Sequence, residues 1–170
     1  LRVYIIAVWR CADDILSEIP SDIQSALFAD DCAIYKSGNN LNLLTKHIQK
    51  SLNTITDWTS KWGFKLSPNK TVAVVFTHNV NNKTKLTLGN NDLKIENSAK
   101  FLGLFFDSRL TWNSHITYIE NRCKSRLNLM RAVAGNTWGA CKSTLLTMYK
   151  TLIRPIIDYG CIAYDSALVS

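Results

Sequence analysis

The chain has 170 residues and 46% of them are hydrophobic, so it can bury a core, which excludes an intrinsically disordered protein. Lys and Arg number 20 against 13 Asp and Glu, and the excess is uneven along the chain. Residues 1–60 carry 5 basic and 7 acidic side chains, residues 61–100 carry 7 and 2, and residues 115–154 carry 7 and 1. This distribution indicates either a polyanionic partner or a well-solvated basic surface.

Cysteine and histidine usage gives no sign of a metal site or of a disulfide framework. The five cysteines form no C-x-x-C pair, and their odd number argues against systematic pairing. We expect mostly buried, reduced thiols in an intracellular protein, with nucleus and cytoplasm not distinguished. They are Cys11, Cys32, Cys123, Cys141 and Cys161. The three histidines are expected to be surface or capping residues, and they are His47, His78 and His115.

The N-terminal third of the chain predicts a hairpin and then a helix. The apolar run at residues 3–9 is too short to cross a membrane, and no membrane association is expected. Residues 25–35, S-A-L-F-A-D-D-C-A-I-Y, predict two short strands with both aspartates at the turn. A helix over 41–62 follows, capped by Gly63. Its apolar face comprises Leu41, Leu44, Ile48, Leu52, Ile55, Trp58 and Trp62. The two tryptophans are expected to pack against the sheet, with stacking on bases as the alternative.

The rest of the chain continues an α+β pattern. A strand is predicted over 71–76, a hairpin across 89–91, and another strand over 100–106. A helix then starts near Asn113 and stops at Gly135. Its apolar face comprises Ile116, Ile119, Cys123, Leu127, Met130 and Ala134. A last helix runs from about Cys141 to Ile153 and is expected to end at Pro155.

Two Asp-Asp pairs are candidates for chemistry. Adjacent carboxylates at a hairpin turn repel one another unless a cation lies between them, and Mg²⁺ prefers carboxylate oxygens. Asp30 and Asp31 therefore fit two-metal nucleotidyl transfer, with a solvated turn as the alternative. Asp13 and Asp14 precede a short segment before Pro20, where acids more simply cap a helix or turn.

Four motifs, in order over about 140 residues, resemble the reverse transcriptases of non-LTR retrotransposons, particularly jockey-like elements. They are F-A-D-D at 28–31, W-G-F-K-L-S-P-N-K-T at 62–71, A-K-F-L-G-L-F-F-D-S-R-L-T-W-N-S-H-I at 99–116 and R-P-I-I-D-Y-G-C-I-A-Y at 154–164. The resemblance implies a partial polymerase palm, an antiparallel sheet with a packed helix, followed by a helical thumb. The expected divisions are a divergent or truncated N-terminal segment at 1–20, a partial palm at 21–110 and a thumb-like helical part at 111–170.

The resemblance also implies catalytic roles for residues of the first and second motifs. Asp30 would be the principal ligand for Mg²⁺ or Mn²⁺ and Asp31 its weaker neighbour. Phe28 and Ala29 would line the floor near the primer end. Lys70 would approach the triphosphate, where an ammonium neutralises pyrophosphate charge or donates a proton; the alternative is a surface lysine in a turn.

The resemblance also implies which residues contact the nucleic acid. Phe101, Leu102 and Gly103 would form the primer grip, with a plain core strand as the alternative. Basic side chains on the polar side of the helix that starts near Asn113 would track the phosphates of a template–primer duplex, or they form a solvated face. These are Arg122, Lys124, Arg126 and Arg131.

The sequence also departs from the family. The family's third palm carboxylate and its Gly-Ser-rich motif are not found before the hairpin. We expect that residues 1–10 do not resemble the family and that the fingers are absent from this chain. C-A-D-D-I-L at 11–16 stands where such enzymes have an aromatic-Ile-Asn-Asp-Ile-Leu segment, so Asp14 matches a non-catalytic position.

We therefore expect a fragment of an RNA-directed DNA polymerase that is inactive alone. In its parent protein it would use an RNA template, a DNA primer and deoxynucleoside triphosphates. The alternative is a non-catalytic, nucleic-acid-binding remnant of a retrotransposon. A metal-dependent nuclease is a weaker reading, because no histidine or third acid lies near the aspartate pair in the sequence.

Overall fold

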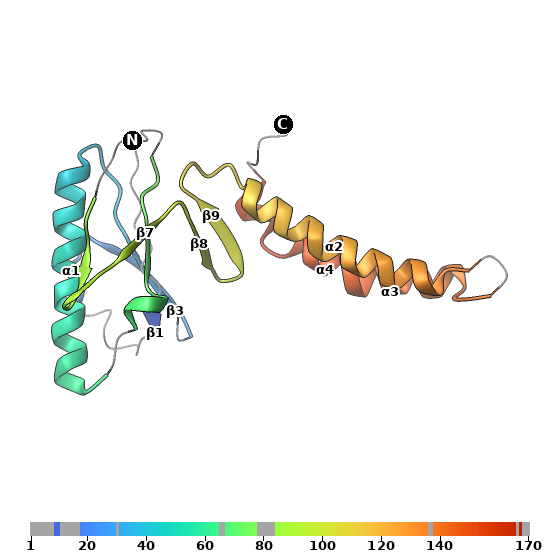
Figure 1. Cartoon of the computed structure of the whole chain (residues 1–170), viewed down its shortest axis with the longest axis horizontal. Helices are drawn as coiled ribbons and strands as arrows, with labels where there is room; N and C mark the ends of the chain where they lie inside the picture. The colour runs from blue at the N-terminus through green and yellow to red at the C-terminus, as the bar shows by residue number, and fades with distance from the viewer. Residues whose placement is uncertain are drawn as a thin grey trace. The chain divides into compact units, whose positions relative to one another are not determined.

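The computed structural model describes residues 9–10, 18–29, 31–64, 67–77, 84–135, 138–165 and 167. Asp30, the pair at 13–14 and His78 lie outside the described residues. The chain divides into two compact units, Leu1–Leu110 and Thr111–Ser170. The first unit holds the strands and one long helix, and the second is helical, so the α+β class is confirmed (Figure 1).

The described strands of the first unit are short and belong to several small sheets. They are β1 (Trp9–Arg10), β2 (Gln24–Phe28), β3 (Asp31–Tyr35), β4 (Val72–Val74), β5 (Thr87–Leu88), β6 (Asn91–Asp92), β7 (Lys94–Glu96), β8 (Ser98–Phe101) and β9 (Leu104–Asp107). A 3₁₀ turn, η2 (Pro68–Lys70), precedes β4.

The long helix α1 (Leu41–Trp62) has the bounds predicted from its periodicity. The Asn40 side chain accepts a hydrogen bond from the Leu43 backbone N–H at 3.2 Å, which satisfies one of the free donors of the first turn. At the other end Gly63 adopts φ 71°, the left-handed conformation of a glycine cap. Both ends of the helix are therefore determined by residues next to it in the sequence.

One face of α1 forms the core of the unit. Leu44, Ile48, Leu52 and Ile55 are 0–4% exposed and pack in one cluster with strand residues. The cluster includes the strand residues Cys32, Ile34, Ala73 and Leu88, and also Leu86 and Leu93, which lie next to strands. Trp58 also packs against the cluster, whereas Trp62 is 61% exposed. Figure 1 shows α1 running along one side of the strands.

The hairpin predicted over residues 25–35 is confirmed. Strands β2 and β3 pair antiparallel from Gln24–Tyr35 to Phe28–Asp31, so two residues connect them. Asp31 is the first residue of β3 and not part of the turn, contrary to the prediction that both aspartates lie at the apex. On the other side of β3, β1 pairs antiparallel, with Arg10 opposite Asp31.

The strand pairing differs from the prediction at two further places. The hairpin across 89–91 is confirmed as β5–β6. The predicted antiparallel pairing is confirmed for β2–β3, β5–β6 and β8–β9, whereas β4 and β7 pair in parallel. The expected single strand over 100–106 is the hairpin β8–β9, in which Phe101 pairs with Leu104. Leu102 (φ 46°) and Gly103 (φ 81°) form its turn, since a two-residue type I′ turn requires positive φ at both positions.

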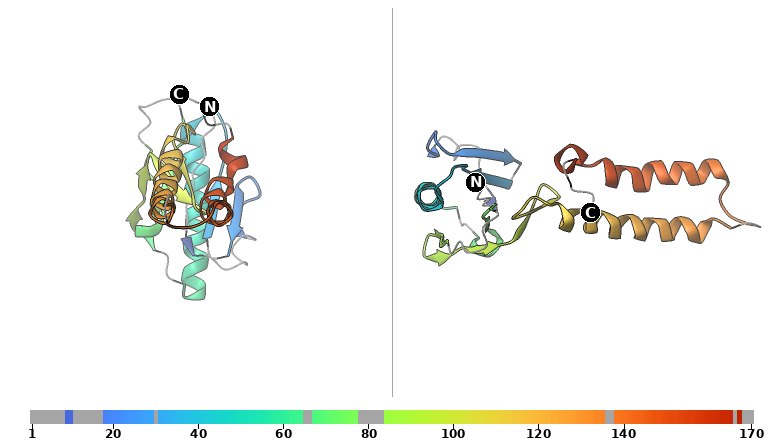
Figure 2. Two further views of the ribbon diagram at one scale, coloured as in Figure 1. Left: turned by 90° about the vertical axis from the view of Figure 1, so that its right-hand side faces the viewer. Right: turned by 90° about the horizontal axis from the view of Figure 1, so that it is seen from above.

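The second unit is a helical hairpin. Helix α2 (Asn113–Val133) runs alongside α3 (Lys142–Met148), the π-helical turn η3 (Tyr149–Ile153) and α4 (Arg154–Asp158), and a short α5 (Cys161–Tyr164) follows (Figure 2). The prediction that Pro155 ends the last helix is wrong. Proline lies in the first turn of α4, where its missing N–H costs no helical hydrogen bond, and η3 carries the chain into that turn.

Two expectations about side-chain environments are also wrong. His115 is 2% exposed and not a surface residue, because Trp112 and Tyr164 lie against its ring, with centroids 6.3 and 5.0 Å away. Of the cysteines that the structure describes, Cys32 is buried, whereas Cys141 and Cys161 are exposed, so the thiols are not mostly buried. No disulfide joins the described cysteines.

Candidate active site and nucleic-acid interface

The β2–β3 hairpin positions the aromatic and acidic residues of the F-A-D-D motif. Side chains alternate along a strand, so Asp31 lies on the face of β3 opposite to Cys32 and Ile34, which are buried against α1. Directly opposite residues share a face, which puts Phe28 beside Asp31. Phe28 is 65% exposed. The hairpin therefore presents an exposed aromatic ring next to a half-buried carboxylate, on the face away from α1.

The connection of this hairpin is conformationally strained. Ala29 has φ 52°, the left-handed region that residues with a Cβ rarely adopt. A two-residue hairpin connection favours positive φ because its twist then matches the twist of the strands. Strained backbone of this kind is held only where the surrounding structure determines it, here by the pairing of Phe28 with Asp31.

The described residues offer the right kind of donor for a hard divalent cation, but too few of them to form a complete site. Asp31 offers carboxylate oxygens, which Mg²⁺ and Mn²⁺ prefer. Within the ranges that the structure describes, no three His, Cys, Asp or Glu residues gather into a metal-binding group. Asp31 would supply one ligand, together with Asp30 as predicted from the motif.

Lys70 lies in the turn before β4. Its backbone N–H donates to the Ser67 carbonyl at 3.0 Å, and the buried Thr71 hydroxyl donates to the same carbonyl at 3.0 Å. These bonds fix the turn while the Lys70 side chain stays exposed. An exposed ammonium on a fixed turn is free to meet a phosphate, and it is equally what an ordinary surface lysine shows.

The predicted primer-grip residues lie at the end of the β8–β9 hairpin. Ala99 of β8 is buried with Val74 and Phe76, so the hairpin is held against β4. Phe101, Leu102 and Gly103 are half-buried, and the last two form the turn. The glycine is required there by its φ of 81°.

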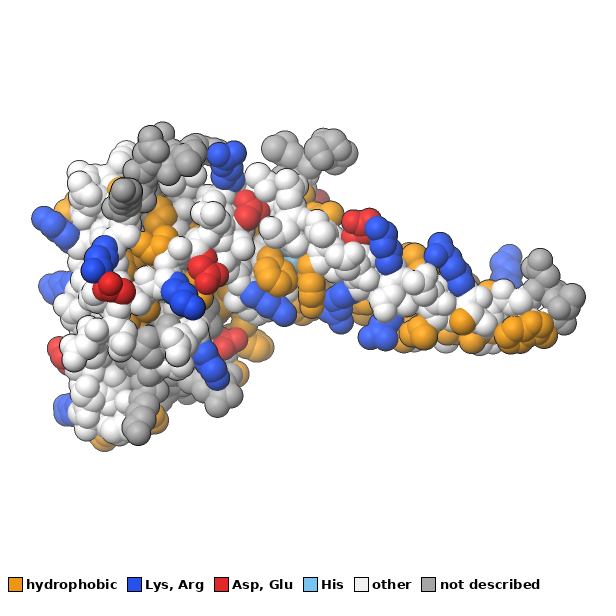
Figure 3. All heavy atoms as spheres, in the orientation of Figure 1, with side chains coloured by type: hydrophobic (Ala, Val, Ile, Leu, Met, Phe, Trp, Pro, Cys, Tyr) orange, Lys and Arg blue, Asp and Glu red, His pale blue; other side chains and the backbone are white. Residues whose placement is uncertain are grey.

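The four basic residues predicted on α2 do not share one face. At about 100° per residue, Arg122 and Arg126 lie together, and Lys124 and Arg131 lie together on roughly the opposite side of the helix. Three of them contact neighbours on the same helix. Arg122 donates to the Tyr118 hydroxyl at 3.4 Å, Lys124 pairs with Glu120 at 2.5 Å, and Arg131 donates to the Asn128 side-chain oxygen at 3.1 Å. In Figure 3, Lys and Arg side chains recur along the helical unit among exposed hydrophobic ones.

A polar cluster outside the predicted site joins the base of the β2–β3 hairpin to α1. Lys36 donates to the carboxylate and the backbone carbonyl of Asp22, and the His47 Nδ1 atom lies 2.6 Å from the same carboxylate and 2.9 Å from the Lys36 ammonium. Hydrogen bonds from Lys36 and then His47 lower the pKa of Asp22 from 3.8 to about 2. No sequence signal pointed to this cluster, because its members are 11 to 25 positions apart.

Comparison with known protein families identifies the chain. The sequence profile of the reverse transcriptase (RNA-dependent DNA polymerase) family matches residues 6–106, more than half of the sequence. The chain belongs to the reverse transcriptase family. The match begins at residue 6, so the expectation that residues 1–10 do not resemble the family is wrong for the second half of that segment.

Curated relatives confirm the resemblance to jockey-like elements. The chain is 24% identical over 152 residues to the RNA-directed DNA polymerase from mobile element jockey of Drosophila melanogaster, covering 88% of the chain and 16% of that protein. Probable RNA-directed DNA polymerases from transposon BS and transposon X-element of the same species are 27% and 28% identical. They cover 79% and 80% of this chain and 15% of each relative.

This reverse transcriptase chain therefore spans about a sixth of the length of these relatives. No solved structure matches it. Among the described helices, none is long and apolar enough to cross a lipid bilayer.

Proposed function

We propose that this chain is part of an RNA-directed DNA polymerase of a jockey-like element and that it contributes the aspartate hairpin of the polymerase site. The observation that carries the proposal is the β2–β3 hairpin within the family match, which sets Phe28 and Asp31 in register around a two-residue connection. In the parent protein the substrates would be an RNA template, a DNA primer and deoxynucleoside triphosphates. By the same reasoning residues 21–110 are a partial palm and residues 111–170 a thumb.

The residues of this chain would act as positioning and charge-neutralising groups in that reaction. Bound Mg²⁺ or Mn²⁺ would activate the primer 3′-hydroxyl and stabilise the leaving pyrophosphate. Asp30 and Asp31 would hold the metal, Phe28 and Ala29 would line the floor below the primer end, and Lys70 would offset pyrophosphate charge. Phe101, Leu102 and Gly103 would hold the primer strand.

The isolated chain is expected to be inactive. A two-metal site needs a bridging carboxylate, and loss of one member of a catalytic constellation costs on the order of 10³ or more in rate. Primer extension on an RNA template with Mg²⁺ or Mn²⁺ should therefore show no incorporation by the isolated chain. Incorporation that Asp30→Asn abolishes would overturn this expectation.

A chimera tests the polymerase function itself. The matching segment of the jockey polymerase is replaced by residues 18–167 of this chain, and RNA-templated primer extension is measured. We expect activity, and we expect Asp30→Asn to lower it by about 10³-fold or more, whereas Asp57→Asn, an exposed acid on α1, should change it less than about 2-fold. A chimera that folds but is equally active with Asp30→Asn would refute the assignment.

A second function is favoured by the charge of the helical unit, namely non-catalytic nucleic-acid binding. From residue 121 to residue 157 the chain carries seven Lys or Arg and no Asp or Glu. Binding of RNA or DNA by the isolated chain should weaken with salt, stay unchanged with Asp30→Asn, and weaken with the double charge reversal Arg122→Glu and Arg126→Glu. The matched control reverses Lys46 and Lys50, which are exposed on α1. Equal losses from both reversals would argue against a specific role of α2.

A further inference from the structure

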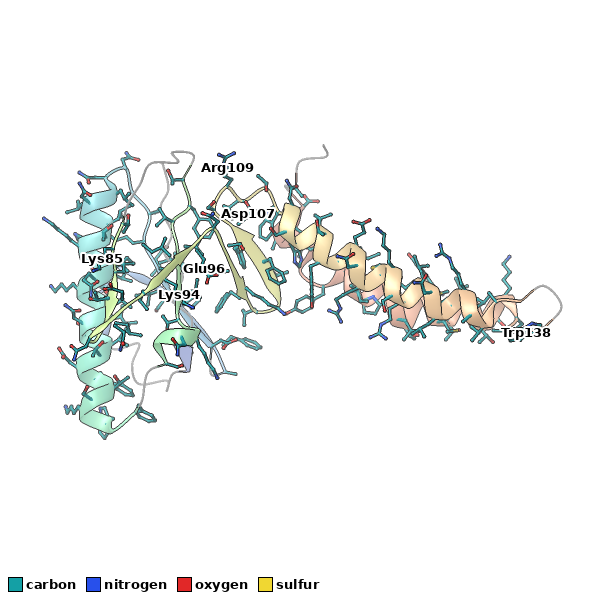
Figure 4. All side chains as sticks on the ribbon, in the orientation of Figure 1. Lys85, Lys94, Glu96, Asp107, Arg109 and Trp138 are labelled. Atoms are coloured by element: carbon teal, nitrogen blue, oxygen red, sulfur yellow. The ribbon has the colours of Figure 1, made fainter. Side chains whose placement is uncertain are left out.

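The connection between α2 and α3 exposes a large aromatic side chain. Trp138 is 69% exposed, whereas Trp112 of the same unit is 5% exposed. Figure 4 shows Trp138 at the end of the helical unit where the two helices are joined. An indole ring carries a large apolar surface, and leaving it in water forfeits the free energy that its burial would provide. An exposed tryptophan is thus a candidate contact residue.

The backbone around this ring is tightly built. Ala134 and Gly139 form an antiparallel β-bridge. A Cβ atom on Gly139 (φ 125°) would lie 2.4 Å from the Val133 carbonyl oxygen, and one on Gly135 would lie 2.1 Å from the Trp138 carbonyl oxygen. The same Cβ on Gly135 would be 3.3 Å from the ring atom Cε2, so one ring edge rests on this glycine. Glycine at position 135 leaves room for this ring edge, while the Trp138 side chain as a whole stays 69% exposed to a partner.

The charges near the ring in the sequence are all positive. Arg131 in the last turn of α2 and Lys142 at the start of α3 are both exposed. Neither forms an ion pair with an acidic residue whose side chain the structure describes. Residues 121–157 contain no Asp or Glu. These positive charges favour a polyanion as the partner of Trp138 over an apolar protein surface that carries few acidic groups.

We propose that Trp138 stacks on an unpaired base of single-stranded nucleic acid while Arg131 and Lys142 contact the adjacent phosphates. Stacking on aromatic rings beside a basic backbone track is how proteins bind single strands without reading their sequence. Within a duplex the base faces are covered by neighbouring bases, so the ring would meet a free base face only at the two duplex ends. The inference rests on the proposed nucleic-acid binding by the helical unit and adds the strand type and the stacking residue.

The test separates stacking from phosphate contacts. Affinity of the full chain is measured by fluorescence anisotropy for labelled oligothymidylate and for an abasic oligonucleotide of the same length and charge. Trp138→Ala should weaken oligothymidylate binding by roughly 5- to 100-fold, the range expected for one stacked base, and should change abasic binding less than about 2-fold. Trp138→Phe should restore most of the affinity because it keeps a stacking ring.

Controls identify which proposal fails if the result differs. Trp62→Ala removes a similarly exposed tryptophan from the other unit and should leave both affinities unchanged. The proposal is overturned if Trp138→Ala changes neither affinity, if it lowers both equally, or if it weakens blunt duplex binding as strongly as single-strand binding. If Arg122→Glu with Arg126→Glu weakens binding while Trp138→Ala does not, the helical unit binds nucleic acid without this stacking residue. If the wild-type chain binds neither oligonucleotide, both proposals fail.

Discussion

The strained connection of the aspartate hairpin can be tested by a pair of Ala-to-Gly substitutions. Ala29 has φ 52°, and the left-handed conformation costs a residue with a Cβ about 1–2 kcal/mol. Glycine avoids that cost but gives up roughly 0.4–1 kcal/mol through the greater freedom of the unfolded chain. Ala29→Gly should therefore raise the free energy of unfolding by about 0.5–1 kcal/mol. Ala26, in the paired part of β2, is the matched control, and Ala26→Gly should lower that free energy by about 1 kcal/mol.

The assay is urea-induced unfolding followed by far-UV circular dichroism, with the free energy of unfolding extrapolated to water and compared at unchanged m-value. The two substitutions remove the same methyl group from positions three residues apart, so opposite signs isolate the effect of φ. If Ala29→Gly destabilises the chain as much as Ala26→Gly does, the connection is not strained in solution and the argument from φ is wrong.

Three further predictions concern titratable side chains. Burial lowers the pKa of His115 below 6.5, so as pH drops the imidazole is protonated at a higher pH in the unfolded chain than in the folded one. The free energy of unfolding should therefore fall between pH 7.5 and 5.5. His115→Gln should reduce that pH dependence, measured by urea unfolding. Hydrogen bonds from Ser143 and Thr144 lower the pKa of Cys141 from 9.0 to about 6, so iodoacetamide at pH 7 should alkylate Cys141 first, and Ser143→Ala should slow it. Contacts with Lys36 and His47 lower the pKa of Asp22 from 3.8 to about 2, so the stabilisation by its carboxylate is complete above its unfolded pKa and is lost as pH falls through about 2. The difference in free energy of unfolding between the original chain and Asp22→Asn should shrink as pH falls through that range.

Local signals made part of the fold predictable. The bounds of α1 followed from apolar spacing, an Asn cap and a Gly cap, all within or next to the helix. The β5–β6 hairpin followed from its turn residues in the same way. Pro155 shows the limit of such reasoning, because a proline ends a helix only if it falls in its interior. Because the π-helical turn η3 precedes it, Pro155 lies in the first turn of α4 and not in a helix interior. No local sequence pattern predicted this π-helical turn.

Tertiary contacts determined what the sequence did not reveal. An isolated histidine reads as a surface residue, but His115 is buried because Tyr164, almost fifty residues later, packs against its ring. The parallel pairing of β4 with β7 likewise joins segments about twenty residues apart. Trp138 gave no signal in the sequence either, since an aromatic residue between two helices is as readily buried as exposed.

The candidate site depends on the same tertiary packing. Asp31 is held at one end of β3 and the cluster of Asp22, Lys36 and His47 joins the other end of the hairpin to α1. Between them Cys32 and Ile34 bury one face of β3 against that helix. The position of the Asp31 carboxylate is therefore fixed by packing on the opposite face and by a polar contact at the far end. A motif search recognises the four residues F-A-D-D, but their geometry is supplied by side chains that the motif does not contain.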